Sequence, residues 1–187
     1  MAKRLDKALV VDVESTCWEG QPPRGQISEI IEVGLCVVDL QLLERVERVS
    51  LMVKPARSEI SPFCTELTGI TSTMVATAAP LSEAVRILRD RYRAADRLLV
   101  SWGDYDRNQF VRNCETYGLK YPFGPTHLNV KTLFSIAHGL PREMGIPAAC
   151  RQVGLRMEGT HHRGVDDAWN IGRLFCLLLQ RFRRAGL

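Results

Sequence analysis

The sequence predicts an α/β domain in which a mixed central sheet is flanked by helices. Three strand-like apolar runs follow one another closely in the first part of the chain, and strand-like and helix-like segments alternate afterwards. The short links between the first three runs favour an antiparallel three-strand meander, and the later alternation adds parallel strands. Because 187 residues suit one domain, we expect residues 1–187 to form a single unit.

The individual elements follow from local patterns. The run ALVVDVE is short, apolar and rich in β-branched residues, which is typical of a buried strand. The later helices show apolar residues at helical spacing and are commonly followed by glycine. The expected strands are 8–14, 29–40, 44–54 and 98–102, and the expected helices are 61–67, 81–92, 104–117, 130–138, 147–153 and one starting near 165.

Composition limits the compartment and the partners. The net charge of +4 is too small to indicate a polyanionic partner by itself. There is no apolar stretch of about eighteen residues and no export signal, so we expect a cytoplasmic protein without a membrane anchor. The six cysteines are widely scattered, which argues against a zinc cluster and against a disulfide framework.

Asp12 and Glu14 are the first candidate functional residues. Side chains two positions apart on a strand share a face, so both carboxylates project in the same direction. They end a run that belongs in the centre of a sheet, where unpaired negative charge is costly. Either the strand reaches solvent here, or a hard divalent cation such as Mg²⁺ compensates the pair.

Asp106 follows the strand-like run LLVSW and lies in the first turn of the next expected helix. An acidic residue there commonly complements the helix dipole and needs no further function. Asp104 is the better candidate for capping this helix, and Asp106 by itself does not indicate a function.

His162 and Asp167 lie five residues apart in the stretch HHRGVDDAWN. This spacing lets a loop place the imidazole of His162 beside the carboxylate at the start of the last helix. We expect Asp166 to start or cap that helix and to face away, and His161 has no special spacing. A structural or merely exposed histidine is the alternative for His162.

Taken together, four carboxylates and one imidazole are too many polar groups for an ordinary core. They suit two metal ions roughly 3.5–4 Å apart that polarise a phosphate and activate a water. The glycine-rich phosphate loops and the GxSxG elbow of serine hydrolases are absent from the sequence, as is any zinc-ligand spacing.

The same stretches resemble the DEDDh 3′→5′ exonucleases of the RNase H-like superfamily. VVDVESTCWEG resembles the first motif of that family, SWGDYDRNQF the second and HHRGVDDAWNI the third. SEIIEVG, SPFCTELTGIT and LKYPFG are similar to the branch that contains the 3′ histone-mRNA exonuclease and the enhanced-RNAi nuclease. The resemblance extends over about residues 8–182 and implies an RNase H-like fold.

The resemblance implies a role for each candidate residue. Two ions, Mg²⁺ or Mn²⁺, are expected on the acids, with Asp106 acting directly or through a water, and His162 is expected to be the general base. Glu14 and Ser15 are expected to lie against the terminal nucleotide. The implied metal ligands are Asp12, Glu14, Asp106 and Asp167, and the implied substrate contacts are Ser15, Phe63, Thr68 and Trp102. A position facing the core is the alternative for Phe63 and Trp102.

The expected activity is metal-dependent 3′→5′ hydrolysis of single-stranded 3′ ends, with RNA preferred and nucleoside 5′-monophosphates released. Animal members carry an additional N-terminal nucleic-acid-binding segment, so we expect a single-stranded end or a short overhang as the substrate rather than a stem-loop. The alternatives are a DNA proofreading or repair exonuclease and a catalytically silent RNA-binding module. The oligomeric state is left open.

Overall fold

The computed structural model describes residues 4–186. Helices and strands follow the order expected from the sequence, with two short additions, α2 and β5. The strands are β1 (Lys7–Ser15), β2 (Ile30–Asp39), β3 (Glu44–Met52), β4 (Leu98–Ser101) and β5 (His127–Asn129). The helices are α1 (Pro62–Thr68), α2 (Ser72–Val75), α3 (Leu81–Asp90), α4 (Tyr105–Thr116), α5 (Val130–Ala137), α6 (Ile146–Gln152) and α7 (Gly164–Arg184).

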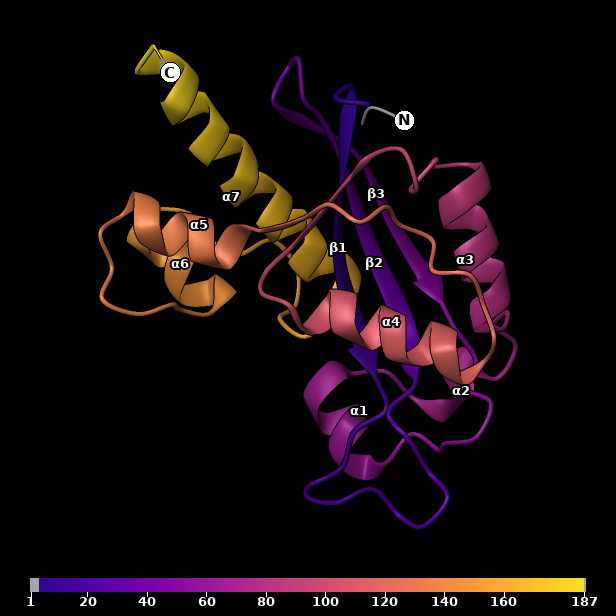
Figure 1. Cartoon of the computed structure of the whole chain (residues 1–187). Helices are drawn as coiled ribbons and strands as arrows, with labels where there is room; N and C mark the ends of the chain where they lie inside the picture. The colour runs from indigo at the N-terminus through magenta and orange to yellow at the C-terminus, as the bar shows by residue number, and fades with distance from the viewer. Residues whose placement is uncertain (1–3, 187) are drawn as a thin grey trace.

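The five strands form one mixed sheet in the order β3-β2-β1-β4-β5. β1, β2 and β3 are antiparallel neighbours, whereas β4 runs parallel to β1 and β5 runs parallel to β4. The predicted mixed α/β architecture is therefore confirmed (Figure 1). β5 was not predicted, because three half-buried residues are too few to show a strand period.

The two faces of the sheet carry separate apolar cores. Leu9, Val11 and Val13 point to the face covered by α3 and α4, and Ala8 and Val10 point to the face covered by α5, α6 and α7 (Figure 1). Because side chains alternate along a strand, Asp12 and Glu14 continue the row of Ala8 and Val10. The sequence of β1 thus places both acids on the α7 side.

The start of α7 lies directly against the sheet because two glycines meet there. A Cβ added at Gly34 of β2 would overlap the carbonyl group of Gly164, and a Cβ at Gly164 would lie 2.9 Å from the carbonyl oxygen of Asp12. Neither position has room for a side chain. This contact brings the first turn of α7 over β1, next to its acidic residues.

The helix bounds agree with the expected ones to within two residues, but one predicted local role is wrong. Asp104 occupies the cap position of α4, but its side chain makes no capping hydrogen bond. Its own backbone is in the helical region (φ −105°, ψ −5°), and its carboxylate instead accepts a hydrogen bond from Asn129 Nδ2 at 3.3 Å. Typical cap residues have an extended backbone, which turns the side chain toward the free N–H groups.

Among the helices of residues 4–186, none combines the length and the apolar character that a bilayer crossing requires.

The glycine contact predicts the effect of a methyl group at this point. Gly34→Ala forces backbone atoms of β2 and α7 apart, so we expect the free energy of unfolding to fall by at least about 3 kcal/mol, the upper end for overpacked sites. Chemical denaturation measures this change. Gly145→Ala is the matched control, because a Cβ there meets nothing closer than 3.8 Å and the backbone φ is −71°. Equal stability losses in the two variants would contradict the tight contact.

Candidate active site

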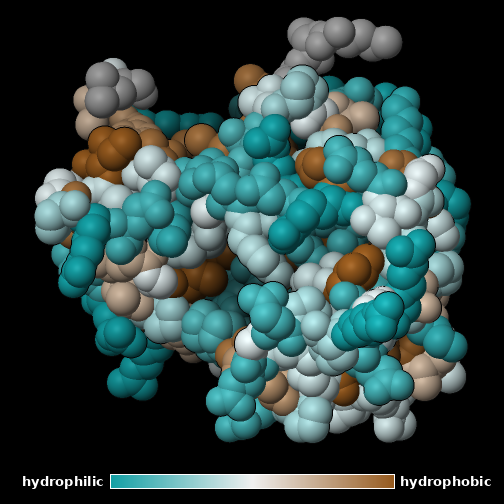
Figure 2. Space-filling view, turned by 60° about the horizontal axis from the view of Figure 1, so that its bottom comes forward, coloured by the Kyte–Doolittle hydropathy of each residue, from teal (hydrophilic) through white to brown (hydrophobic). Residues whose placement is uncertain are grey.

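A cleft of about 290 Å³ opens at the carboxyl end of β1. Figure 2, in which the lower end of Figure 1 comes forward, shows a hollow with mostly hydrophilic residues around it. Residues from β1, α1, α4, α6, α7 and the loop before α7 line the cleft. They are Asp12, Val13, Glu14, Ser15, Cys17, Leu67, Trp102, Tyr105, Asp106, Ile146, His161, His162 and Asp167.

Three carboxylates converge on one point of this cleft. One oxygen each of Asp12, Glu14 and Asp167 can be chosen so that all three lie within 4.8 Å of one another. Asp12 and Glu14 come from adjacent same-face positions of β1, and Asp167 comes from the first turn of α7. Acids that are more than 150 positions apart in the sequence therefore meet at one end of the sheet.

Asp106 joins this group from α4 through a contact with the backbone of β1. Its Oδ1 accepts a hydrogen bond from the backbone N–H of Val13 at 2.9 Å, and only 4% of the residue is exposed. β4 pairs with β1 only as far as Val10, so the N–H of Val13 has no strand partner on this side. The Asp106 carboxylate accepts this hydrogen bond in place of a neighbouring strand, and the bond fixes the orientation of the carboxylate.

Burial and mutual repulsion make these carboxylates reluctant to ionise. Burial raises the pKa of Asp106 to about 7 and that of Glu14 to about 9, and repulsion by Asp167 adds to both shifts. The pKa values of Asp12 and Asp167 are raised as well, again chiefly by burial. Such clusters of carboxyl groups with raised pKa values are typical of functional sites.

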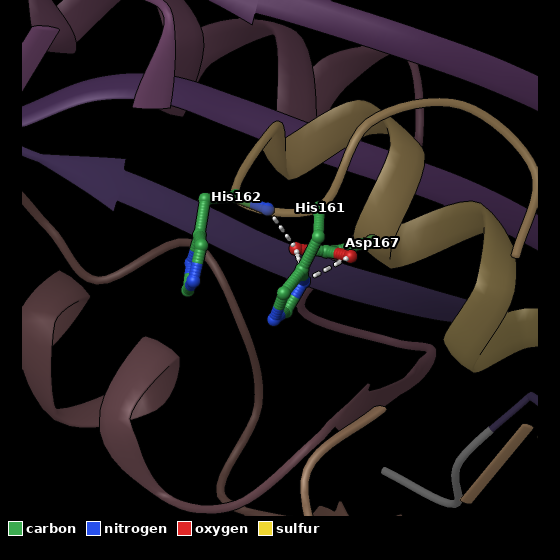
Figure 3. A group of neighbouring side chains, drawn as sticks. All are labelled: His161, His162 and Asp167. Carbon is green, nitrogen blue, oxygen red and sulfur yellow. Dashed lines mark hydrogen bonds and ion pairs between the residues drawn. The ribbon is translucent and has the colours of Figure 1, made fainter. Parts of the chain in front are cut away.

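The two neighbouring histidines hold Asp167 in different ways (Figure 3). The ring of His161 contributes its Nδ1, which lies 3.0 and 3.1 Å from the two oxygens of Asp167. His162 donates only its backbone N–H, at 2.8 Å, while its ring stacks on that of His161 with 3.9 Å between centroids. The expectation that the loop places the ring of His162 beside Asp167 is therefore wrong in one respect: the ring of His161, which the spacing did not single out, is the one that hydrogen-bonds to the carboxylate.

His162 has a left-handed backbone, with φ at 64°. This conformation is uncommon for residues other than glycine and is costly, so the surrounding contacts must impose it. It lets the backbone N–H bind Asp167 while the side chain lines the cleft. Burial lowers the pKa of His162, which favours the neutral ring at neutral pH.

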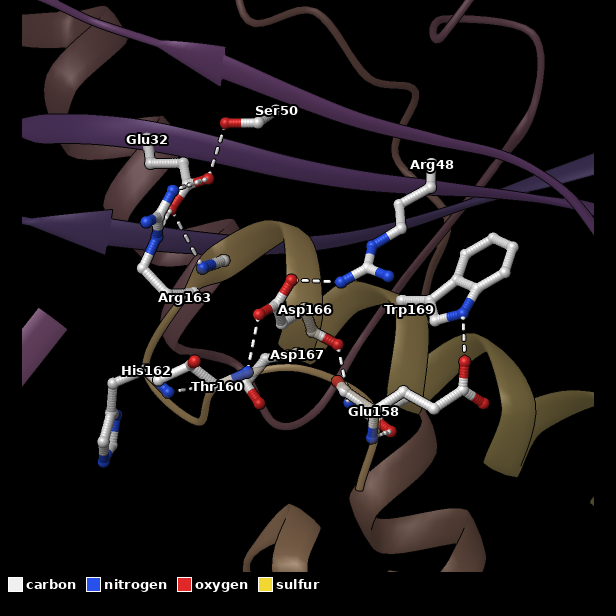
Figure 4. Close-up of polar contacts among 12 residues, drawn as sticks. Glu32, Arg48, Ser50, Glu158, Thr160, His162, Arg163, Asp166, Asp167 and Trp169 are labelled. Atoms are coloured by element: carbon white, nitrogen blue, oxygen red, sulfur yellow. Dashed lines mark hydrogen bonds and ion pairs between the residues drawn. The ribbon is translucent and has the colours of Figure 1, made fainter. Parts of the chain in front are cut away.

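A buried ion pair anchors the same loop to the sheet (Figure 4). Glu32 of β2 is fully buried and accepts hydrogen bonds from Arg163 Nε at 3.2 Å, from the Gly164 N–H at 3.1 Å and from Ser50 Oγ at 2.6 Å. Sequence reasoning did not find Glu32, because its position opposite Glu14 depends on the register between β1 and β2, which the strand bounds alone do not give.

Asp166 faces away from the cleft, as predicted. Its carboxylate accepts a hydrogen bond from the Thr160 N–H at 2.6 Å and pairs with Arg48 of β3. Of the two adjacent acids, only Asp167 therefore reaches the cleft.

Two of the expected substrate contacts line the cleft. Ser15 is 5% exposed, and within residues 4–186 its hydroxyl finds no hydrogen-bond partner. A buried hydroxyl without a partner is costly, so this group has hydrogen-bonding capacity that the described chain leaves unused. Trp102 is half-buried: its ring packs on Phe134, and its Nε1 donates to the Met144 carbonyl at 2.9 Å.

The other two expected contacts do not line the cleft. Phe63 is 38% exposed on α1, so the alternative that it faces the core is wrong. Thr68 is 1% exposed, and its hydroxyl donates to the Cys64 carbonyl and accepts from the Ile70 N–H. α1 contributes Leu67 instead, which lies one turn after Phe63 on the same face of the helix.

The donor set suits hard divalent cations. All four acids offer oxygen ligands, and within the described part of the chain no lysine or arginine forms an ion pair with any of them. Oxygen-rich sites of this kind bind Mg²⁺ and Mn²⁺ rather than soft metals. The negative charge of the four acids therefore fits compensation by divalent metal ions better than compensation by lysine or arginine side chains.

These observations define a hydrolase with a carboxylate-rich metal site. The family model RNase_T, described as Exonuclease, matches residues 9–175. The chain therefore belongs to this exonuclease family, and the predicted DEDDh resemblance is confirmed. Membership implies divalent metal ions at the acids.

Known relatives agree in sequence and in structure. The 3'-5' exonuclease Snipper of Drosophila melanogaster is 30% identical over 92% of this chain and 69% of its own length. The human 3'-5' exoribonuclease 1 is 28% identical over 94% of this chain, which spans about half (53%) of that relative. The nuclease domain of 3'hExo, a DEDDh family member bound to rAMP, superposes with a TM-score of 0.87 at 27% identity, covering 97% of this chain and 95% of that domain.

The raised pKa values predict how the metal-free protein responds to pH. A carboxyl whose pKa is higher in the folded than in the unfolded state holds its proton longer when folded, so stability falls as pH rises through that window. With a chelator present, we expect the melting temperature to fall between about pH 5 and about pH 9. The unfolded chain loses these protons near the ordinary carboxyl pKa, whereas folded Asp106 keeps its proton to about pH 7 and folded Glu14 to about pH 9. Thermal denaturation measures this slope.

Glu14→Gln provides the comparison, since it removes the carboxyl whose pKa is raised to about 9. The variant should show a flatter dependence over the same range, and excess Mg²⁺ should raise the melting temperature of the native protein most at the alkaline end. A melting temperature that rises with pH in the native protein and in the variant alike would contradict the assignment.

Proposed function

We propose that the chain is a metal-dependent 3′→5′ exonuclease acting on single-stranded 3′ ends, with RNA preferred over DNA. The observation that carries this proposal is the convergence of four poorly compensated carboxylates and one neutral histidine in a single cleft. Residues 1–187 form a single exonuclease domain in this proposal, and the family match at 9–175 supports it.

The metal ligands in this proposal are Asp12, Glu14, Asp106 and Asp167. Two Mg²⁺ or Mn²⁺ ions would supply Lewis-acid polarisation of the scissile phosphate and a lower pKa for the attacking water. β1 fixes Asp12 and Glu14, the Val13 N–H fixes Asp106, and His161 with the His162 N–H fixes Asp167. Each acid is thus oriented by the chain before metal binds.

His162 is the general base of the proposed reaction. Its ring is neutral at neutral pH because burial lowers its pKa, so a ring nitrogen can accept the proton of the attacking water. The water oxygen then bonds to phosphorus, and the 3′ oxygen of the preceding nucleotide leaves, which releases a nucleoside 5′-monophosphate. Glu14, at the end of β1, would lie with Ser15 against the terminal nucleotide.

The substrate contacts in this proposal surround the terminal nucleotide. Ser15 offers its unpartnered hydroxyl, and Trp102 offers the exposed part of its ring. Phe63 is exposed on α1 on the same face as Leu67, outside the cleft lining, and would contact a nucleotide that reaches beyond Leu67. A contact between Thr68 and the substrate stays a prediction. The Thr68 hydroxyl donates to the Cys64 carbonyl within α1, so any effect of Thr68 on the substrate comes through the position of the neighbouring Leu67.

The preference for RNA rests on the relatives. Several are exoribonucleases by name, and the solved nuclease domain of 3'hExo holds rAMP. A catalytically silent RNA-binding module is disfavoured, because four acids in a cleft repel phosphate unless cations lie between them. A DNA proofreading or repair exonuclease is the alternative. Rates on RNA and DNA oligonucleotides of the same sequence distinguish it from an exoribonuclease.

Asp12→Asn tests the metal assignment. The variant loses a ligand oxygen that carries charge, so we expect turnover of a labelled oligonucleotide to fall by roughly a thousandfold or more, since metal ions supply several kcal/mol of transition-state stabilisation. The native enzyme should shorten a single-stranded RNA faster than DNA of the same sequence. Gel analysis of the shortened products measures both.

The protein should remain folded in this variant, because removing one of several repelling charges relieves the metal-free cluster. Asp90→Asn is the matched control, since Asp90 is exposed on α3 outside the cleft. Normal digestion by Asp12→Asn would overturn the metal assignment, and equal rates on RNA and DNA would overturn the sugar preference.

His162→Ala tests the general base. We expect kcat to fall by about a hundredfold to ten-thousandfold, the usual contribution of a positioned base. Burial places the pKa of His162 below its ordinary value, so the rate of the native enzyme should fall only at acidic pH, where the ring becomes protonated. The His162→Ala variant should not show the part of this fall that protonation of His162 causes.

Rate measurements from about pH 5 to about pH 8 test this, with Mn²⁺ calorimetry to show that metal still binds. His138→Ala, at the end of α5 outside the cleft, is the control. An unchanged rate and an unchanged pH profile in His162→Ala would exclude it as the base.

A further inference from the structure

A second hydrogen-bonded cluster lies behind Asp106, on the far side of the cleft wall. It joins the end of β4, the turn that follows and the start of β5 through Ser101, Gly103 and His127. We infer that His127 is a positioning residue that fixes the start of α4 and, through it, the carboxylate of Asp106. This inference rests on the metal-binding role proposed for Asp106.

Sheet pairing brings His127 to this place. β4 and β5 are parallel, with Leu99 beside His127 and Ser101 beside Asn129. Side chains of Leu99, Ser101 and His127 share one face of the sheet, because they occupy matching positions of the alternation. That is also the face against which α4 packs. His127 therefore lies between the sheet and the start of α4.

The direction of the hydrogen bonds follows from the donors that are present. Ser101 Oγ lies 2.7 Å from the Gly103 carbonyl oxygen, which only accepts, so the hydroxyl proton is donated there. The same Oγ lies 2.8 Å from His127 Nε2, and with its proton already used it accepts from that nitrogen. His127 thus donates through Nε2, and Ser101 passes the constraint on to Gly103.

Gly103 is the point where this constraint acts on the helix. Its φ is +106°, a conformation that residues with a side chain rarely adopt. The turn at Gly103 separates β4 from α4, and α4 begins at Tyr105 with Asp106 in its first turn. Holding the Gly103 carbonyl therefore sets the position from which Asp106 reaches the Val13 N–H.

The cluster superficially resembles a nucleophilic serine with its histidine and aspartate, but its geometry excludes that role. Ser101 is fully buried, and its hydroxyl proton is donated to Gly103. His127 Nδ1 lies 3.6 Å from Asp104 Oδ1, beyond hydrogen-bond distance, and the Asp104 side chain is mostly exposed. A nucleophilic serine needs access to substrate and a base that receives its proton, and Ser101 has neither.

His127→Phe tests the inference, because it keeps an aromatic ring but removes the donor. We expect the affinity for Mn²⁺, measured by calorimetry with the metal alone, to fall roughly tenfold to a hundredfold, as for other groups that orient metal ligands. The Val13 amide, which Asp106 shields, should exchange its hydrogen faster, while other β1 amides stay unchanged. His127→Gln keeps an N–H donor near the Nε2 position and should restore both readouts to within about threefold.

Ser101→Ala provides the second variant and carries the test if His127→Phe does not fold. It should weaken Mn²⁺ binding in the same way, and the double variant should be no weaker than either single one, since both interrupt one chain of bonds. His138→Phe, the same exchange at the end of α5, should leave both readouts unchanged.

Native affinity and native Val13 exchange in Ser101→Ala would overturn the inference, as would additive losses in the double variant. The same measurements distinguish a failure of this inference from a failure of the proposed function. A native protein that binds no Mn²⁺ would refute the metal site, whereas the exchange of the Val13 amide would still report whether His127 positions Asp106.

Discussion

The contact between Gly34 and Gly164 is the constraint on which the rest of the site depends. It places the first turn of α7 directly against β1 and β2, with no side chain in between. Asp167 can then reach the point where Asp12 and Glu14 already project from β1. A side chain at either glycine would push α7 away from the sheet and move Asp167 away from Asp12 and Glu14. A shared Mg²⁺ does not tolerate such a shift, because its bonds to oxygen ligands are only about 2.1 Å long.

The convergence has an electrostatic cost that the protein does not remove by itself. Arg163, whose charge acts on Glu14, pairs with Glu32 and not with any of the four acids. The pKa values of these acids are raised, which shows that the folded chain alone disfavours their ionised forms. Divalent cations reverse that preference, so metal binding and ionisation of the cluster are linked. The same cost explains why a pure binding module gains nothing from this arrangement.

Each acid is held by a different kind of contact. The Val13 N–H holds Asp106 because β4 stops early, and the His161 ring together with the His162 backbone holds Asp167. The left-handed backbone of His162 separates its two functions, since its N–H faces Asp167 and its ring lines the cleft. Rigid orientation before metal binding lowers the reorganisation needed during the reaction.

The sequence by itself determined the mixed sheet and its meander, and it determined that Asp12 and Glu14 share a face, because the period of a strand is a local property. Its motifs also singled out Asp106, His162 and Asp167 as candidates, and all three line the cleft. Only the tertiary structure decided that the ring of His161 binds Asp167, that Thr68 is bonded within α1, and that Glu32 and His127 support the site. These facts depend on loop direction and on pairing between distant segments, which no local spacing encodes.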